Sequence, residues 1–213
     1  MSGEADNTPR AIAEHEAAHV VVALVTMGNH PESVTIEPSE GYDGRRVGRE
    51  SVASSVAENP HKRRIRRAMT LLAPAVLAAP HDLFALPAVE FFEYFFAPGK
   101  PHSQDAKDVI NVFLFWWDTP QEMHSIIRGI ASRTKVLLGH PLVKHSIADV
   151  RDRLLAKPTL YTEDLEDVTR TLMSERQSIM SWLRAQMRGP EGPGPNGRSG
   201  RRLRHADGTL VRS

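Results

Sequence analysis

The sequence predicts a mainly helical domain with one small β element, on three observations. Helix-start signals recur along the chain, including Thr8-Pro9, Asn59-Pro60 and a capping box at TPQE, residues 119–122. Two short β-like runs flank a Gly-containing turn near residues 40–44. The chain has 213 residues, 40% of them apolar, which is enough for one domain with a real core.

The first elements follow from local signals. Thr8 and Pro9 predict the N-cap and first position of a helix that runs to about Met27, with Gly28 placed to end it. Residues 33–37 and 46–52 are then predicted to form a β-hairpin or a small sheet edge.

The remaining elements are predicted to be helical, apart from one aromatic stretch. Asn59-Pro60 opens a helix through about residue 79, with a basic start that reads as a solvated face. Residues 80–101 are predicted to be irregular, with the aromatics of FFEYFF lining the core or a pocket. Later helices are expected from a Ser103 cap to about 118, from the Thr119 box to Leu138 before Gly139, from Pro141 to about Ala156, and after a Thr162 cap.

Composition limits the partners and the compartment. The net charge is +1, so we expect no nucleic-acid partner and no strong attraction to a membrane surface. The longest aliphatic run, residues 20–25, is far shorter than the ~20 residues that span a bilayer. The absence of cysteine excludes disulfides and thiolate zinc sites, and with a polar N-terminus it fits a soluble, cytoplasmic protein.

The C-terminal segment has a different composition. Residues 188–213 contain six arginines against one glutamate and one aspartate and are dense in Gly and Pro. This composition predicts a disordered basic tail behind a helical domain of residues 1–187.

The chemistry of the chain is expected at HEAAH, residues 15–19, inside the first helix. His15 and His19 are four residues apart, so they lie about 40° apart around a helix and are able to share one metal ion. Two neutral imidazoles suit Zn²⁺, which lowers the pKa of water toward about 7. Glu16, about 100° from His15, is placed to act as the general base that takes a proton from that water.

A third metal ligand is needed, because catalytic zinc usually has three protein ligands. The extended pattern HExxHxxGxxH fails, since Val22 and Val25 stand at its last two fixed positions. Asp105, in the first turn of its predicted helix, is a candidate ligand or an acid that only stabilises that helix. Four other residues remain candidates: His102, Asp108, Glu50 and Glu58.

The order of four motifs resembles the peptidase domain of FtsH-type zinc metalloproteases. HEAAH is followed by VTIEP (34–38), by SQD (103–105) and by PTL (158–160), and the resemblance covers roughly residues 10–175. It implies a helical, zincin-like peptidase domain in which His15, His19 and Asp105 hold Zn²⁺ and Glu16 is catalytic. Ala18 replaces a glycine of the family motif.

The resemblance implies a zinc metalloendopeptidase that cleaves unfolded or extended protein segments. No GxxxxGKS or GxxxxGKT loop occurs, so we expect a stand-alone, ATP-independent domain that cuts unfolded peptides or works with a separate unfoldase. The strand at residues 34–37 is expected to pair with substrate by edge addition. Two alternatives remain: a protease that clips one regulatory protein, and a non-catalytic, metal-stabilised interaction domain.

Overall fold

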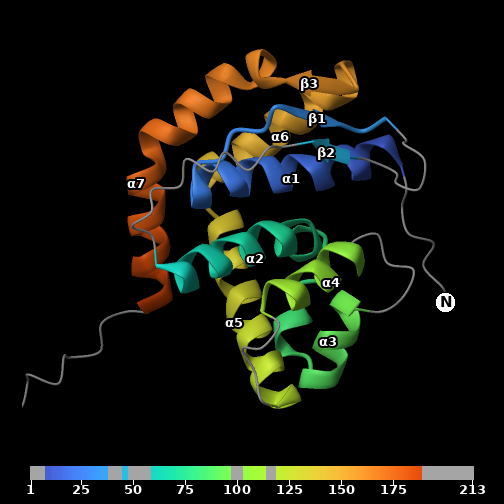
Figure 1. Ribbon diagram of the computed structural model, residues 1–213, viewed down its shortest axis with the longest axis vertical. Helices are drawn as coiled ribbons and strands as arrows, with labels where there is room; N and C mark the ends of the chain where they lie inside the picture. Colours follow the sequence, from blue (N-terminus) through green and yellow to red (C-terminus); the bar gives the residue numbers. More distant parts are fainter. Residues whose placement is uncertain (1–7, 38–44, 48–58, 97–102, 114–118, 189–213) are drawn as a thin grey trace, which may run out of the picture.

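A computed structural model describes residues 8–37, 45–47, 59–96, 103–113 and 119–188 of the chain. Within these ranges the fold is mainly helical with one small antiparallel sheet, as predicted (Figure 1). The helices are α1 (Pro9–Met27), α2 (Pro60–Leu77), α3 (Ala88–Phe96), α4 (Ser103–Val112), α5 (Pro120–Leu138), α6 (Pro141–Ala156) and α7 (Glu166–Arg188). The strands are β1 (Ser33–Thr35), β2 (Arg45–Val47) and β3 (Thr159–Tyr161).

Both predicted ends of α1 are confirmed. Thr8 Oγ1 accepts a hydrogen bond from the Ala11 N–H at 3.2 Å, which satisfies one of the unpaired donors at the helix start. Gly28 ends the helix with φ of 72°, a left-handed conformation that glycine adopts at little cost. The Gly28 N–H bonds back to the carbonyls of Ala23 and Leu24 at 3.1 and 3.0 Å.

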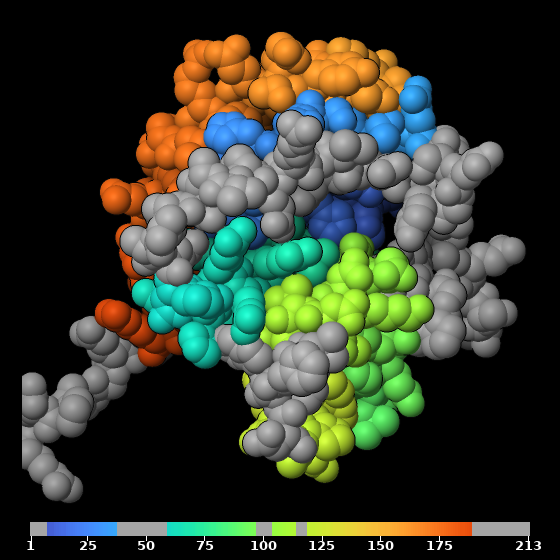
Figure 2. Space-filling model, in the orientation of Figure 1, coloured from blue at the N-terminus to red at the C-terminus, as the bar shows by residue number. Residues whose placement is uncertain are grey.

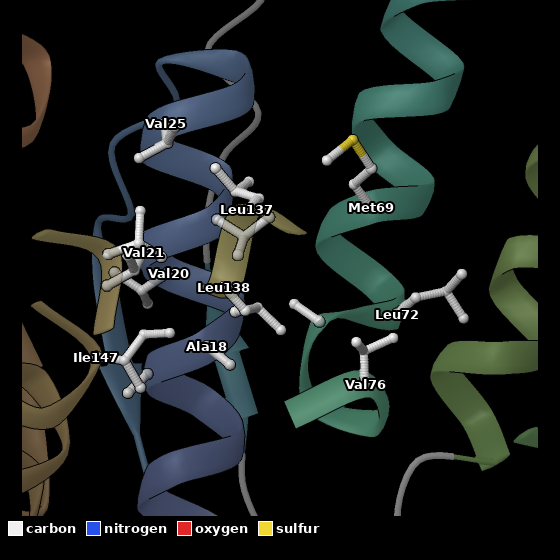
Figure 3. Packing of buried hydrophobic residues seen from close by; sticks show 14 of the residues in the cluster. Ala18, Val20, Val21, Val25, Met69, Leu72, Val76, Leu137, Leu138 and Ile147 are labelled. Atoms are coloured by element: carbon white, nitrogen blue, oxygen red, sulfur yellow. The ribbon is translucent and has the colours of Figure 1, made fainter. Parts of the chain in front are cut away.

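Helix α1 is the centre of the fold (Figure 1). It packs against α2, α6, α7 and β1, so every residue from Glu16 to Thr26 is buried. Figure 3 shows Val20, Val21 and Val25 among side chains from other helices, with Met69, Leu72 and Val76 on the neighbouring α2. Polar side chains in such a helix need partners, because unpaired polar burial is costly.

Helix α2 begins where the sequence predicts and continues through a proline. Asn59 Oδ1 accepts from the His61 N–H at 2.9 Å, so Asn59 is the N-cap. The first turn is exposed and the second half, from Ala68 to Val76, is largely buried against α1, α4 and α5. Pro74 lies inside this buried half.

The prediction that residues 80–101 are irregular is wrong for most of the segment. A 3₁₀ turn at Leu83–Ala85 is followed by α3, which carries the aromatic stretch. Phe91 and Phe95, four residues apart, are buried on one face, and Phe92 stacks on Phe96 with ring centroids 4.0 Å apart. Aromatic pairs at this spacing stabilise a helix, and the run FFEYFF contains two such pairs, Phe91 with Phe95 and Phe92 with Phe96.

Helices α5 and α6 begin and end where the sequence predicts, whereas α4 is shorter than predicted. The Thr119 capping box is present: the Glu122 N–H donates to Thr119 Oγ1 at 3.2 Å, and Glu122 Oε2 accepts from the Thr119 N–H at 3.3 Å. α5 ends before Gly139, and α6 spans Pro141–Ala156 as expected. α4 begins at Ser103 itself and ends at Val112, short of the expected residue 118; residues 114–118 lie outside the described part.

The prediction that Thr162 caps the last helix is wrong. Thr162 begins a 3₁₀ turn, Thr162–Leu165, and α7 starts only at Glu166. The Thr162 hydroxyl instead donates to the Pro31 carbonyl at 3.0 Å, which ties this turn to the segment before β1. Within this turn, Asp164 Oδ2 accepts a hydrogen bond from the Tyr161 N–H at 2.9 Å.

The sheet has one strand more than predicted. The expected pairing of β1 with β2 is confirmed, and β3 pairs antiparallel on the other side, giving the order β2-β1-β3. Val34 therefore faces Arg46 on one side and Leu160 on the other. The prediction that β1 offers an edge to substrate is wrong, because both of its edges are already paired.

Several predictions fall outside the described residues. They concern the tail at 189–213 and the candidate ligands His102, Glu50 and Glu58. None of the described helices combines the length and the apolar character needed to cross a bilayer.

Candidate metal centre

His15 and His19 lie one turn apart on α1 and face each other. Their ring centroids are 4.8 Å apart, and the Nε2 atoms approach to 3.2 Å. The prediction that the two imidazoles point the same way is therefore confirmed, and it follows directly from the helical repeat.

Asp105, in the first turn of α4, completes the cluster. Its Oδ2 lies 3.1 Å from His15 Nε2 and 3.2 Å from His19 Nε2, although 86 residues separate Asp105 from His19. α2 packs against both α1 and α4 and so holds α4 beside the histidines. In the described part of the chain, these three residues form the group that could hold a metal ion.

The geometry of the three atoms fits a tetrahedral metal ion. Ligands about 2.0–2.1 Å from Zn²⁺ in tetrahedral geometry are about 3.3–3.4 Å from one another. The observed separations are 3.1, 3.2 and 3.2 Å, a nearly equilateral triangle of almost that size. These three atoms would together be able to hold one metal ion.

The protonation state of His19 adds a second argument for a cation. His19 Nδ1 lies 2.9 Å from the Thr70 carbonyl oxygen, which is only an acceptor, so Nδ1 must carry the proton and donate. In a neutral imidazole this leaves the lone pair on Nε2, facing Asp105 Oδ2. Two lone pairs at 3.2 Å repel each other unless a proton or a metal ion lies between them.

Protonated histidines also keep Asp105 ionised. Burial raises the pKa of its carboxyl, but the charge and the hydrogen bonds of protonated His19 and His15 outweigh burial and hold that pKa well below the usual range. The carboxyl is therefore ionised at neutral pH, as a metal ligand must be.

Solvent reaches one side of the cluster. The side chains of His15 and Asp105 are 22% and 21% exposed, while His19 is buried. Figure 2 shows the beginning of α1 (dark blue) set back from α2 and α4, at the bottom of a hollow on this face. The cluster thus has a protein side and an open side, as expected for a site with a free coordination position.

Glu16 is the buried acid of the motif. The residue is only 6% exposed, and it forms no hydrogen bond or ion pair with another described residue. It follows His15 directly, about 100° round the helix, and is not one of the three clustered residues. Its carboxylate oxygens keep contact with solvent, because no fully buried side-chain oxygen among the described residues lacks a hydrogen-bond partner.

Asp108, a competing candidate for the third ligand, does not belong to the cluster. Its Oδ1 accepts from Gln104 Nε2 at 3.3 Å, within α4. The sequence predictions did not include the backbone carbonyl of Thr70, which holds His19 from α2.

Comparison with known proteins adds no relative: no family model, curated protein or solved structure matches the chain. The resemblance to FtsH-type peptidase domains therefore stays a prediction that depends on the four motifs.

Proposed function

We propose that this chain is a zinc-dependent metallopeptidase that cleaves internal peptide bonds of unfolded or extended protein segments. The observation that carries the proposal is the triangle of His15, His19 and Asp105, next in sequence to Glu16, which is buried and has no partner in the described part of the chain. The two histidines and Glu16 come from one HExxH motif, and the motif order that resembles FtsH-type peptidases supports the same reaction.

Zinc is the metal that suits these ligands best. Two imidazoles and one carboxylate with an open position are a common ligand set of catalytic zinc, whereas Mg²⁺ and Ca²⁺ prefer all-oxygen sites. When bound, Zn²⁺ supplies a Lewis acid that polarises the scissile carbonyl and makes water a stronger nucleophile.

The protein residues then have separate tasks. Glu16 accepts a proton from the attacking water as its oxygen bonds to the carbonyl carbon. The same carboxyl passes that proton to the amine nitrogen when the C–N bond breaks, so the products are one acid and one amine. His15, His19 and Asp105 hold the metal, and the Thr70 carbonyl fixes the ring of His19.

The sheet suggests how an extended substrate binds. β1 is paired on both sides, so a substrate strand is able to add only along the outer strands β2 or β3. Strand addition requires a segment with a free backbone, which favours unfolded peptides over folded proteins. A folded substrate would need a separate unfoldase.

A non-catalytic, metal-stabilised interaction domain is the main alternative. It is favoured by the way the cluster links α1 to α4 directly and to α2 through Thr70, as a structural ion would. Structural zinc sites, however, are usually closed by four protein ligands. Among the described residues the cluster has three ligands, and His15 and Asp105 are partly exposed, which favours catalysis.

A comparison of two glutamates on α1 tests the proposal. Glu16→Gln should retain zinc and lose about 10²–10⁴-fold in the rate of casein cleavage, because the amide cannot accept the proton. Glu14→Gln is the matched control, since the Glu14 side chain is 43% exposed and, among the described residues, its one ion pair is with Arg151, at 3.6 Å. Zinc content is measured by mass spectrometry, and cleavage is measured with and without chelator.

The outcomes of this comparison distinguish the metallopeptidase from its two alternatives. Cleavage by the wild type and Glu14→Gln, but not by Glu16→Gln, supports the proposal. Cleavage by Glu16→Gln at the wild-type rate refutes the role of Glu16. Zinc-loaded wild type that cleaves neither casein nor unfolded peptides favours the interaction domain, and cleavage of one folded protein alone favours a dedicated regulatory protease.

A further inference from the structure

Pro74 lies inside α2, four residues after the carbonyl that holds His19. From this spacing we infer that Pro74 is a positioning residue of the metal centre: it leaves the Thr70 carbonyl free, and that carbonyl sets the ring of His19 for metal binding. The inference rests on the metal centre of the proposed function and concerns how the protein prepares it.

Pro74 removes the helical hydrogen-bond donor of the Thr70 carbonyl. In an α-helix the N–H of residue 74 would donate to the carbonyl of residue 70. Proline has no N–H, and its ring presses against the carbonyl four residues back, which turns that carbonyl away from the helix axis. Thr70 O therefore lacks its ordinary helical donor.

The Thr70 carbonyl is buried, and His19 supplies its hydrogen-bond donor. Thr70 is 3% exposed, so a free carbonyl there would be buried without a donor, at a cost of about 1–3 kcal/mol. The Thr70 hydroxyl does not relieve it, because Oγ1 donates to the Arg66 carbonyl at 3.2 Å. His19 Nδ1 supplies a donor at 2.9 Å, from the helix packed against α2.

The consequence for His19 is a fixed tautomer and ring orientation. With Nδ1 held by the Thr70 carbonyl, Nε2 is the ring atom that faces Asp105 and His15 and that would bind the metal. Hydrogen bonds of this kind to the second nitrogen of a ligating histidine typically change metal affinity by 10–100-fold. One proline in α2 thus prepares a ligand on α1.

The first experiment uses the metal-free wild-type protein at pH 8, with ¹⁵N-labelled histidine. Long-range ¹H–¹⁵N NMR spectra should show a proton on Nδ1 of His19 that exchanges slowly with water, because it is bonded to the buried Thr70 carbonyl. An Nδ1 without a proton, or an Nδ1 proton that exchanges freely with water, would overturn the inference without any variant.

The second experiment compares Pro74→Ala with Pro120→Ala. Alanine at 74 restores the N–H that competes with His19 for the Thr70 carbonyl. We expect the zinc Kd to rise 10–100-fold, while the melting temperature of the metal-free protein stays equal or rises, because alanine favours a helix interior. A proline that serves only packing predicts a lower melting temperature and unchanged zinc affinity.

Pro120→Ala makes the same chemical change at the first position of α5, where the missing N–H has no helical acceptor. It should leave zinc affinity unchanged. Wild-type zinc affinity in Pro74→Ala, with the Nδ1 proton of His19 retained, would contradict the inference even if the enzyme is active. Conversely, a wild-type protein that binds zinc but cleaves nothing would refute the peptidase proposal and leave this inference intact.

Discussion

Asp105→Ala is the sharpest test of the metal centre, because this carboxylate joins α4 to both histidines of α1. If Asp105 is a ligand, its loss removes one of three protein bonds to the ion. Zinc sites of four ligands bind with about 10–16 kcal/mol, or roughly 3 kcal/mol per ligand. Since 1.4 kcal/mol is a tenfold change, we expect the zinc Kd to rise by about 100-fold.

The effect on stability follows from mass action. At free zinc of about 100 times the wild-type Kd, binding stabilises the native protein by about 2.7 kcal/mol. A 100-fold weaker variant gains only about 0.4 kcal/mol at the same zinc concentration. In a chain of 213 residues, the missing 2.3 kcal/mol corresponds to a zinc-dependent rise in Tm that is about 5–9 °C smaller.

The assay is the Tm of each variant across a series of buffered zinc concentrations, including none. The zinc-dependent rise is compared rather than the Tm itself, so any change in the metal-free fold cancels. Asp108→Ala is the control, because Asp108 lies one turn further along α4 and bonds only to Gln104 among the described residues. Higher zinc should restore Asp105→Ala and make no difference to the control.

An identical zinc-dependent rise in Asp105→Ala and wild type would remove Asp105 from the site. The acid would then only stabilise the first turn of α4, by about 0.3–1 kcal/mol with or without zinc. The search for a third ligand would move to His102, Glu50 and Glu58.

Two further predictions concern the scaffold. Gly28→Ala should lower the free energy of unfolding, measured in urea, by about 1–2 kcal/mol, because the φ of residue 28 is 72°. The new Cβ would also lie 3.3 Å from Nη1 of Arg176, whose guanidinium donates to the carbonyls of Val25 and Thr26. Unchanged stability would refute this account of the cap. The bidentate bonds of Arg153 lower the pKa of Asp167 from 3.8 to about 2, so this pair stabilises the fold above about pH 4 and its contribution is lost as the pH falls toward 2. Because Asp167 is largely exposed, Asp167→Asn should cost only about 0.2–1 kcal/mol at pH 7 and progressively less between pH 4 and 2; a pH-independent cost would exclude the ion pair as its cause.

Elements with local stop and start signals could be predicted from the sequence. The caps of α1 and α5 act within three or four residues, so Thr8, Gly28 and Thr119 report them directly. β3 could not be predicted this way. It has three residues and exists through pairing with β1, more than 120 residues away, for example between Thr159 and Thr35.

The metal centre also has one part that local sequence predicts and one part that depends on tertiary packing. The pairing of His15 with His19 follows from the 3.6-residue helical repeat and needs no tertiary information. The position of Asp105 depends on how α2 packs between α1 and α4, and no local pattern encodes that packing. The place of Asp105 in the first turn after Ser103 and the resemblance of the motif order to FtsH-type peptidases favoured Asp105 over Asp108, but neither shows that the carboxylate reaches the histidines.

The Thr70 carbonyl is a different case, because every residue has a carbonyl and no side-chain pattern marks one of them. The sequence feature that marks this carbonyl is Pro74, four residues later in the buried half of α2. Proline destabilises a helix interior, whereas alanine would not. A proline inside a helix that packs against an HExxH helix predicts a free carbonyl one turn earlier, able to hold a ligand histidine. Zinc affinity that falls in Pro74→Ala while the metal-free helix becomes more stable would show that the proline serves the metal centre at the expense of helix stability.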